Sequence, residues 1–196
     1  MTENLPYLIV GLGNPGRDYS QTRHNFGFML IDRLALRLNA HGMKIQSKAI
    51  VISVLYNGQK LILAKPQTFM NLSGQAVQGL VNFYKLPLEN LLIAHDDLDL
   101  PFCSLRIRPG GGAGGQKGIK SILEHLGTAN FARLRLGIDR PPGRMDIADY
   151  VLQDFTSKEF IVVSETLEHA VDASLAWVAN GLNFAMNNFN VATVNK

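Results

Sequence analysis

The sequence predicts a single α/β domain over residues 1–196, with a mixed β-sheet. Two observations predict this fold class. Short apolar runs suited to buried strands alternate along the chain with segments of helical spacing, and no linker or repeat separates them. Asn57-Gly58 is the strongest short signal for a hairpin, and residues 49–56 and 60–64 on either side predict its two strands. The hairpin places antiparallel pairing in the sheet.

The elements before and after that hairpin have their own signals. Residues 7–11 are a short apolar run that ends in glycine, which is typical of a buried strand, and a polar loop follows over 13–25. Apolar residues near helical spacing predict a helix over 26–40. After the hairpin, Ser73 is suited to be the N-cap of a helix that runs to Tyr84.

The middle of the chain predicts two strands, a glycine-rich loop and a helix. Residues 91–94 are apolar and predict a buried strand that ends at His95-Asp96. A strand is also expected over 104–108. The glycine-rich loop covers 109–118, and the helix after it is expected to run to about residue 126.

The last third of the chain completes the sheet and adds helices. Residues 132–138 predict a strand with Arg133 and Arg135 on one face, because side chains alternate along a strand. A loop over 139–146 follows. Thr156-Ser-Lys-Glu159 is a capping box that opens a long helix ending near residue 181, and a final apolar helix is expected over 182–189.

Composition excludes several classes of protein. The one cysteine, Cys103, allows no intrachain disulfide framework, which favours a reducing compartment. No apolar run reaches the roughly 18 residues of a membrane span, and the N-terminus lacks the pattern of a secretory signal. These features predict a soluble cytoplasmic protein without membrane association.

Charge is distributed unevenly along the chain, whose formal net charge is +3. The stretch from Arg106 to Arg144 holds eight basic residues against two acidic ones, whereas the remainder is mildly acidic. We call this stretch the basic block. The basic residues are Arg106, Arg108, Lys117, Lys120, Arg133, Arg135, Arg140 and Arg144. Such clustering favours a polyanionic partner such as a phosphate or a nucleic acid, or else reflects a solvated surface with local charge bias.

Residues 11–16 match the dinucleotide-binding pattern G-x-G-x-x-G directly after a strand. A nicotinamide oxidoreductase is therefore one hypothesis. In that fold, however, the helix starts within the glycines so that its N-terminus meets the pyrophosphate. Here Pro15 and a polar stretch come before the next helix, and Asp32 lies within a helical pattern instead of at a strand end. A tight turn is the favoured interpretation.

Polar residues with catalytic chemistry lie in two other segments. His24, in a polar loop at a helix start, is a candidate general base because its pKa lies near working pH. The acidic turn Asp96-Asp97-Leu98-Asp99 follows a buried strand, where α/β sheets place their sites. One of its carboxylates is suited to orient His24, as in catalytic triads; the alternative is that the cluster holds a divalent cation.

Two further segments are candidate binding elements. Asn71 follows an aromatic residue and a methionine and is suited to place an amide over an apolar pocket. The backbone N–H groups of the glycine-rich loop are suited to face an anion, with Lys117 adding charge. That loop lacks the spacing of a nucleotide-binding P-loop, because Gly118 follows Lys117.

Taken together and in order, these segments resemble bacterial-type peptidyl-tRNA hydrolase over nearly the whole chain. Five blocks carry the resemblance. They are Val10-Gly-Leu-Gly-Asn-Pro-Gly16 with Tyr19, Thr22-Arg-His-Asn-Phe-Gly27, Lys65-Pro-Gln-Thr-Phe-Met-Asn-Leu-Ser-Gly74, His95-Asp-Asp-Leu-Asp-Leu-Pro101 and Gly110–Gly118. The resemblance implies a twisted mixed sheet flanked by helices on both faces, a monomer, and no metal or organic cofactor. The implied activity is hydrolysis of the ester between a peptide and the 3′ end of tRNA, which releases both for recycling after aborted translation.

The resemblance also implies residue roles. His24 matches the base that takes a proton from water, and Asp96 the carboxylate that orients it. Asn14 matches the residue that separates N-blocked from free-amino substrates. Asn71 matches the amide that positions the substrate and stabilises the oxyanion. Tyr19 and Phe69 match substrate-contacting positions, and Arg108 and Arg135 match basic positions for phosphates of the tRNA acceptor stem, whose 3′ CCA end enters the site.

The chain departs from the family pattern in the glycine-rich loop. Many members have His-Asn where this chain has Gln116-Lys117. Lys117 donates hydrogen bonds but accepts none, and it adds positive charge. We expect it to meet a phosphate or to point to solvent. A second hypothesis for the whole chain is a non-catalytic RNA-binding module, since some relatives of the family are RNA-splicing cofactors.

Overall fold

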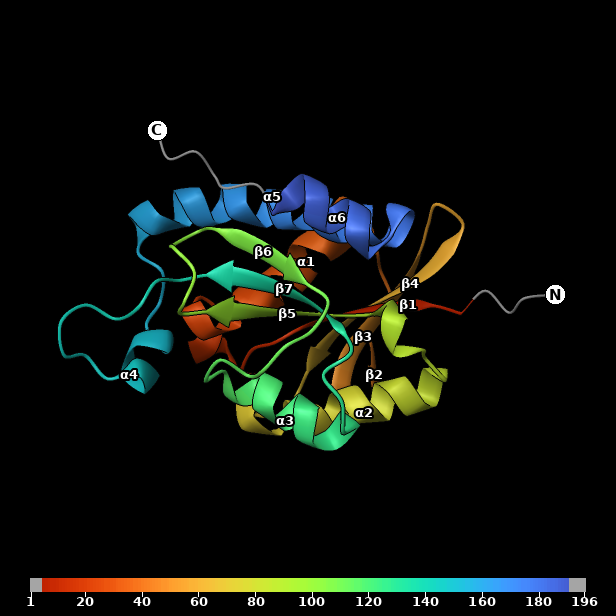
Figure 1. Ribbon diagram of the computed structural model, residues 1–196, viewed down its shortest axis with the longest axis horizontal. Coiled ribbons are helices and arrows are strands. Elements are labelled where there is room, and N and C mark those ends of the chain that lie inside the picture. The colour runs from red at the N-terminus through yellow and green to blue at the C-terminus, as the bar shows by residue number, and fades with distance from the viewer. Residues whose placement is uncertain (1–4, 191–196) are drawn as a thin grey trace.

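The computed structural model describes residues 5–190 and has a mixed sheet in the strand order β2-β3-β4-β1-β5-β7-β6 (Figure 1). The strands are β1 (Tyr7–Gly11), β2 (Lys44–Gln46), β3 (Ala49–Tyr56), β4 (Gln59–Pro66), β5 (Leu91–Asp97), β6 (Leu105–Arg108) and β7 (Ala132–Gly137). The helices are α1 (Phe26–Arg37), α2 (Ser73–Tyr84), α3 (Lys117–Leu126), α4 (Ile147–Val151), α5 (Ser157–Asn180) and α6 (Leu182–Phe189).

The centre of the sheet is parallel and both margins are antiparallel. Strand β1 pairs in parallel with β4 and β5, and β5 pairs in parallel with β7. The hairpin of β3 and β4 and the pair β6–β7 are antiparallel, as a mixed sheet requires. The carboxyl ends of β1 and β5 therefore meet at one edge, where α/β sheets hold their sites.

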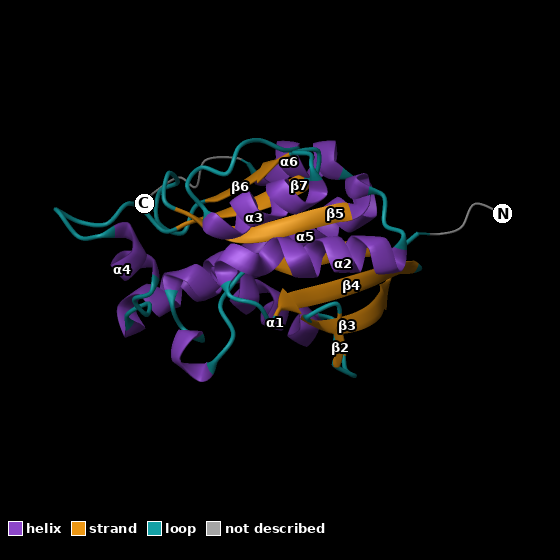
Figure 2. Ribbon diagram, turned by 90° about the horizontal axis from the view of Figure 1, so that it is seen from below, coloured by secondary structure: helices purple, strands orange, loops and turns teal. Residues whose placement is uncertain are grey.

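Helices cover both faces of the sheet. Figures 1 and 2 show α1, α5 and α6 on one face and α2 and α3 on the other. Side-chain alternation divides β1 between the two cores: Ile9 packs on the α1 side, whereas Leu8 and Val10 pack on the α2 side. On the α5 side, Tyr7 and Trp177 meet edge to face with ring centroids 5.1 Å apart.

Most differences from the predicted elements lie in short segments. Strand β5 also runs further than predicted, to Asp97, so Asp96 and Asp97 lie within the strand and not in a turn after it. Strand β2 has three residues, all at least partly exposed, so it has no apolar pattern to detect. Helix α4 has five residues and was not predicted. Ser73 is the first residue of α2 and not its N-cap; its hydroxyl donates to the carbonyl of Met70. Helix α1 ends at Arg37, before the predicted end.

Four single turns of 3₁₀ helix interrupt the loops, and three of them carry candidate site residues. They are η1 (Arg17–Tyr19), η2 (Arg23–Asn25), η3 (Met70–Leu72) and η4 (Leu88–Asn90). Within residues 5–190, no helix is long and apolar enough to cross a membrane.

Candidate active site

Close packing of glycines brings the start of α1 onto the ends of β1 and β5. A Cβ added at Gly11 would lie 2.0 Å from the carbonyl oxygen of Gly27, and one added at Gly27 would lie 2.5 Å from that of Ala94. A side chain at either position would push the helix off the sheet. The glycines therefore set the distance between η2, just before α1, and the end of β5.

This contact brings His24 and Asp96 together, although 72 residues separate them. His24 Nδ1 lies 2.8 Å from Asp96 Oδ2, and the two residues are only 8% and 2% exposed. Of the three aspartates at 96, 97 and 99, Asp96, near the end of β5, is the one beside His24. Because the bond uses Nδ1, the other ring nitrogen of His24, Nε2, is left for a ligand.

Burial and pairing act in opposite directions on this dyad. Burial favours the neutral imidazole, but the adjacent Asp96 carboxylate outweighs it and raises the pKa of His24 above its ordinary value, against a smaller lowering by Lys117. Burial likewise opposes ionisation of Asp96, yet His24 and a hydrogen bond from Gln116 hold the pKa of Asp96 below its ordinary value. The dyad is therefore an ionised carboxylate beside an imidazole of enhanced basicity.

The second histidine of the region is held in a different way. His95 is fully enclosed, and its Nδ1 lies 2.7 Å from the carbonyl oxygen of Asp96. Burial lowers the pKa of His95, which keeps this imidazole neutral. Since only His24 of the two lines the cavity described below, it is the histidine placed to act as a base.

Arg23 anchors the turn that carries His24, and sequence reasoning missed this role. Its guanidinium donates to the carbonyl of Asp154 at 2.7 Å and to Glu159 Oε1 at 2.7 Å. The same group stacks over the rings of Tyr150 and Phe155. Arg23 is 6% exposed, so this is a buried cation with several partners. The sequence gives no signal for it beyond its place beside His24.

Asn25 and Asn14 form a second clamp beside the dyad. Asn25 Oδ1 accepts from the backbone N–H of Asn14 at 2.8 Å, and Asn25 Nδ2 donates to the carbonyl of Asn14 at 3.0 Å. The Asn14 side chain accepts from the N–H of Met70 through Oδ1 at 2.8 Å. This bond fixes the amide orientation, so Asn14 turns its Nδ2 donor toward the cavity.

A cavity of about 700 Å³ joins these groups. Asn14, His24, Phe69, Asn71, Asp96 and Lys117 all line it, so six of the nine predicted site residues meet at one place. Asn71 lies in η3, and Phe69 precedes η3 with 58% of its surface exposed. Helix α4 also lines the cavity, through residues that include Ile147 and Val151, which the sequence did not indicate.

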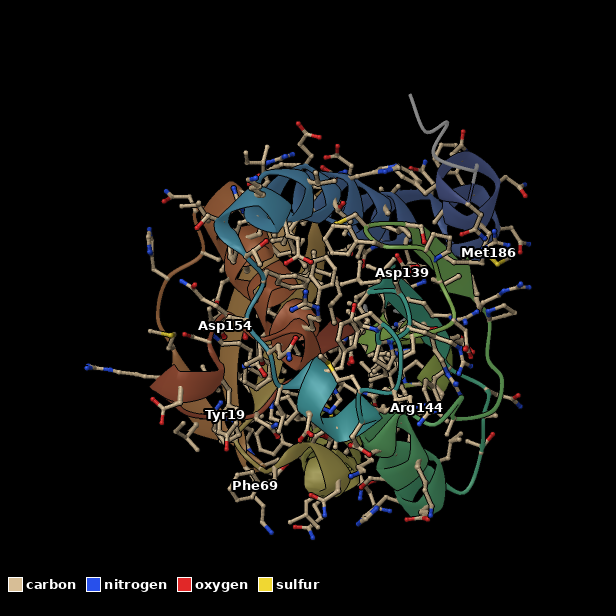
Figure 3. All side chains as sticks on the ribbon, turned by 90° about the vertical axis from the view of Figure 1, so that its left-hand side faces the viewer. Tyr19, Phe69, Asp139, Arg144, Asp154 and Met186 are labelled. Carbon is tan, nitrogen blue, oxygen red and sulfur yellow. The ribbon has the colours of Figure 1, made fainter. Side chains whose placement is uncertain are left out.

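Tyr19 does not line this cavity. It lies in η1 over Gly16, whose added Cβ would contact the tyrosine ring at 3.6 Å. In the view of Figure 3, Tyr19 and Phe69 lie on the same side of this end of the molecule, with α4 in front. Gly16, just before η1, has φ of 114°, a backbone conformation that favours glycine.

The arginines of the basic block have different roles in the structure. In β6 and β7, Arg106 pairs with Arg135 and Arg108 with Arg133, so four cationic side chains share one face. Arg133 is buried and donates to the carbonyls of Gly111 and Gly112, which anchors the glycine-rich loop. Arg135 donates through Nε to Asp97 Oδ2 at 2.6 Å, and Arg108 is exposed.

The three aspartates at 96, 97 and 99 each pair with a different basic side chain. Asp96 pairs with His24, Asp97 with Arg135 and Asp99 with Arg140. The three carboxylates therefore do not converge, contrary to the hypothesis that the turn holds a divalent cation. Over the described part of the chain, no group of three or more histidine, cysteine or acidic side chains has the geometry of a metal site.

The structure also explains the glycine pattern at residues 11–16 without a dinucleotide. Gly11 and Gly13 are packed against α1, where a Cβ at Gly13 would lie 2.7 Å from the ring of Phe28. The chain then passes through η1 and η2 before α1 begins at Phe26. Only a single 3₁₀ turn, and no α-helix, begins directly after these glycines, so the helix start that binds a pyrophosphate is missing at this point of the described chain.

Comparisons with known proteins agree on one family. The model of the family described as "Peptidyl-tRNA hydrolase" matches residues 8–196. A peptidyl-tRNA hydrolase of Bacillus cytotoxicus is 49% identical over 183 residues, covering 93% of this chain and 98% of that protein. A peptidyl-tRNA hydrolase of Chloroflexus aggregans is 50% identical over 188 residues, covering 94% and 98%.

Solved structures agree with these sequence matches. A crystal structure of a peptidyl-tRNA hydrolase in complex with n-propanol superposes with a TM-score of 0.90 at 35% identity and full coverage of both chains. The peptidyl-tRNA hydrolase of Acinetobacter baumannii gives a TM-score of 0.89 at 36% identity, with 97% of each chain covered.

Proposed function

The chain belongs to the peptidyl-tRNA hydrolase family, a family of carboxylic-ester hydrolases, and on that premise we propose that the His24–Asp96 dyad cleaves the ester between a peptide and the 3′ end of tRNA. One observation carries the proposal. A buried imidazole is bonded through Nδ1 to a buried carboxylate at 2.8 Å, on the wall of a cavity large enough for the end of a tRNA and an aminoacyl group.

In the proposed reaction, His24 Nε2 takes a proton from a water molecule, and the water oxygen attacks the ester carbonyl carbon. Asp96 stabilises the imidazolium that forms, because its charge and its hydrogen bond both favour the protonated ring. The tetrahedral intermediate then collapses and breaks the bond to the 3′ oxygen of the ribose. That oxygen receives the proton from His24, which restores the neutral base.

Asn14 is proposed to select the N-blocked substrate. Its Oδ1 is occupied by the N–H of Met70, so the cavity meets a donor from Asn14 and not an acceptor. A peptide carbonyl accepts that hydrogen bond. A free aminoacyl ester offers an ammonium group in the same region, which has no lone pair and is repelled by a donor.

The remaining cavity residues are proposed to hold the two ends of the substrate. Asn71 positions the ester and donates to the developing oxyanion, a contribution on the order of 3 kcal/mol to the transition state. The exposed ring of Phe69 is suited to stack on the terminal base or ribose. Lys117, Arg108 and Arg135 extend positive charge from the cavity along α3 and β6–β7, toward phosphates of the CCA end and acceptor stem.

The whole enzyme is proposed to act as a monomer that recycles tRNA after aborted translation. The experiment that tests the dyad compares wild type with His24→Ala on N-acetylaminoacyl-tRNA, with the free-amino form of the same tRNA in parallel. General-base catalysis is typically worth about 10²–10⁴-fold, so His24→Ala is expected to lose at least about a hundredfold in kcat. Its Kd for tRNA should stay within about twofold of wild type.

Two outcomes would contradict the proposal. A near wild-type rate for His24→Ala would remove His24 as the base. Tight tRNA binding by wild type with no cleavage of either ester would favour the RNA-binding module, which the same four arginines of β6 and β7 would support.

A further inference from the structure

Gln116 is a buried side chain to which neither the sequence nor the reaction above assigns a part. It precedes α3 and is 8% exposed. Its Oε1 accepts from the backbone N–H of Ile119 at 2.9 Å, which makes Gln116 the N-cap of α3. Its Nε2 donates to Asp96 Oδ1 at 3.0 Å and lies 3.3 Å from the sulfur of Met70.

These contacts allow only one orientation of the amide. A flipped amide would bring Oε1 against the Asp96 carboxylate and point N–H at the N–H of Ile119, so both contacts would become repulsive. Gly118 holds this part of α3 close, since a Cβ there would lie 2.5 Å from the Met70 sulfur and 2.9 Å from Leu12. The helix start, and with it the Gln116 donor, is thereby fixed against the site.

The Asp96 carboxylate is held at both oxygens by these partners. Oδ2 faces His24 and Oδ1 faces Gln116, from different elements on opposite sides. A carboxylate with one partner is free to turn about its terminal torsion, which is broad and roughly two-fold. With two partners, Oδ2 stays in the plane and at the distance that the imidazole requires.

We infer that Gln116 is a positioning residue of the reaction, whose amide clamps Asp96 so that Oδ2 orients His24 and Nε2 of His24 faces the substrate. This inference rests on the proposed function. Gln116 acts through Asp96, while its other contact caps α3 and fixes Lys117, the first residue of that helix, beside the cavity. One amide therefore couples the dyad to the glycine-rich loop.

The test separates the effect of the hydrogen bond from Gln116 to Asp96 from the effect of Gln116 as the N-cap of α3. Gln116→Asn retains an amide that caps a helix well but is one methylene too short for Asp96, and Gln116→Met fills the volume with neither contact. Both variants are expected to lose between about tenfold and about a hundredfold in kcat, with unchanged KM for N-acetylaminoacyl-tRNA. Only Gln116→Met should also lose thermal stability. Glu124→Gln, an exposed change on the same helix, is the control that stays at wild-type rate.

The titration of His24, followed by NMR of the imidazole, gives a readout that needs no substrate. The other titratable groups facing the dyad are Lys117 and the neutral His95, and both are retained in each variant. Loss of the Gln116 donor leaves Asp96 a stronger partner for the imidazolium, so His24 should titrate at higher pH, and the acid limb of kcat/KM should move the same way.

The inference is overturned if Gln116→Asn has wild-type kcat while Gln116→Met does not, because helix capping alone then accounts for the loss. It is also overturned if neither variant shifts the His24 titration. The proposed function itself fails by a different result, namely that the His24→Ala variant retains its rate of hydrolysis. If Gln116→Met does not fold, the rate and titration of Gln116→Asn decide.

Discussion

At the scale of single residues, His24 and Asn14 each have one side-chain contact that determines which of their atoms is left for the substrate. His24 is hydrogen-bonded to Asp96 through Nδ1, which leaves Nε2 available. Asn14 gives Oδ1 to the N–H of Met70 and keeps Nδ2. The orientation of both side chains is therefore set by the protein's own hydrogen bonds.

Asn14→Asp replaces the hydrogen-bond donor Nδ2 of Asn14 with a carboxylate oxygen, which is an acceptor. One carboxylate oxygen still accepts from the N–H of Met70, and the second presents an acceptor and a negative charge where Nδ2 was. We expect kcat/KM for N-acetylaminoacyl-tRNA to fall by at least about tenfold, because a peptide carbonyl is now repelled. The ratio of blocked to free-amino cleavage should fall as well. Asn39→Asp, which makes the same charge change on the surface, should alter neither value.

Lys117→Met tests the electrostatics of the dyad. The Lys117 ammonium lowers the pKa of His24, in opposition to Asp96. Its removal should raise that pKa, and since the base must be neutral, the acid limb of the kcat/KM profile should move to higher pH. The shift is measured as the pH of half-maximal kcat/KM at low salt. The control is Lys120→Met. If the acid limb of its kcat/KM profile moves by the same amount, the shift is a general effect of charge and not a specific effect of Lys117.

At the scale of elements, long patterns were predictable and short ones were not. The strands of the hairpin, β5, β7 and α5 have apolar periodicity or capping signals over many residues, and the structure confirms them. β2, α4 and the 3₁₀ turns are too short to carry a period, so tertiary contacts decide them. Helix α4 lines the cavity, and its residues therefore could not be predicted from the sequence.

The candidate site follows the same division. His24, Asp96, Asn14 and Asn71 came from motifs and meet in one cavity. Gln116 and Arg23 lie beside those motif residues in the sequence. Their structural roles, however, depend on hydrogen bonds to residues distant in sequence, such as Asp96 and Glu159. Spacing along the chain contains no information about such contacts.

Arg23→Met tests the attachment of η2 to the start of α5. The change removes a buried cation with hydrogen bonds to Asp154 and Glu159, and we expect the free energy of unfolding to fall by about 2–3 kcal/mol. Activity should fall too, because the turn that carries His24 loses its anchor. Arg33→Met, which breaks a partly exposed pair with Glu168 of the same helix, should cost less than about 1 kcal/mol and leave kcat unchanged. Urea denaturation and steady-state rates provide the comparison.

At the scale of the whole molecule, the members of the basic block differ in how far they are available to a phosphate. Arg108 on β6 is exposed, whereas Arg133 is buried against the glycine-rich loop and Arg135 holds Asp97. Arg108→Gln is expected to weaken tRNA binding and to reduce the slope of log Kd against log salt by about one. The matched change Arg37→Gln, on a surface ion-pair cluster between α1 and α5, should leave that slope as it is.

The contacts of Arg23 have a consequence for folding of the chain during its synthesis. The last strand of the sheet ends at Gly137, whereas the partners that hold Arg23 occupy residues 150–159. During synthesis, then, every strand leaves the ribosome before the turn bearing the base can be locked. A nascent chain of that length would contain every described strand but would lack the partners of Arg23 and the two helices, α5 and α6, that cover one face of the sheet. We therefore expect the base to be held in place only after the last quarter of the chain has been synthesised.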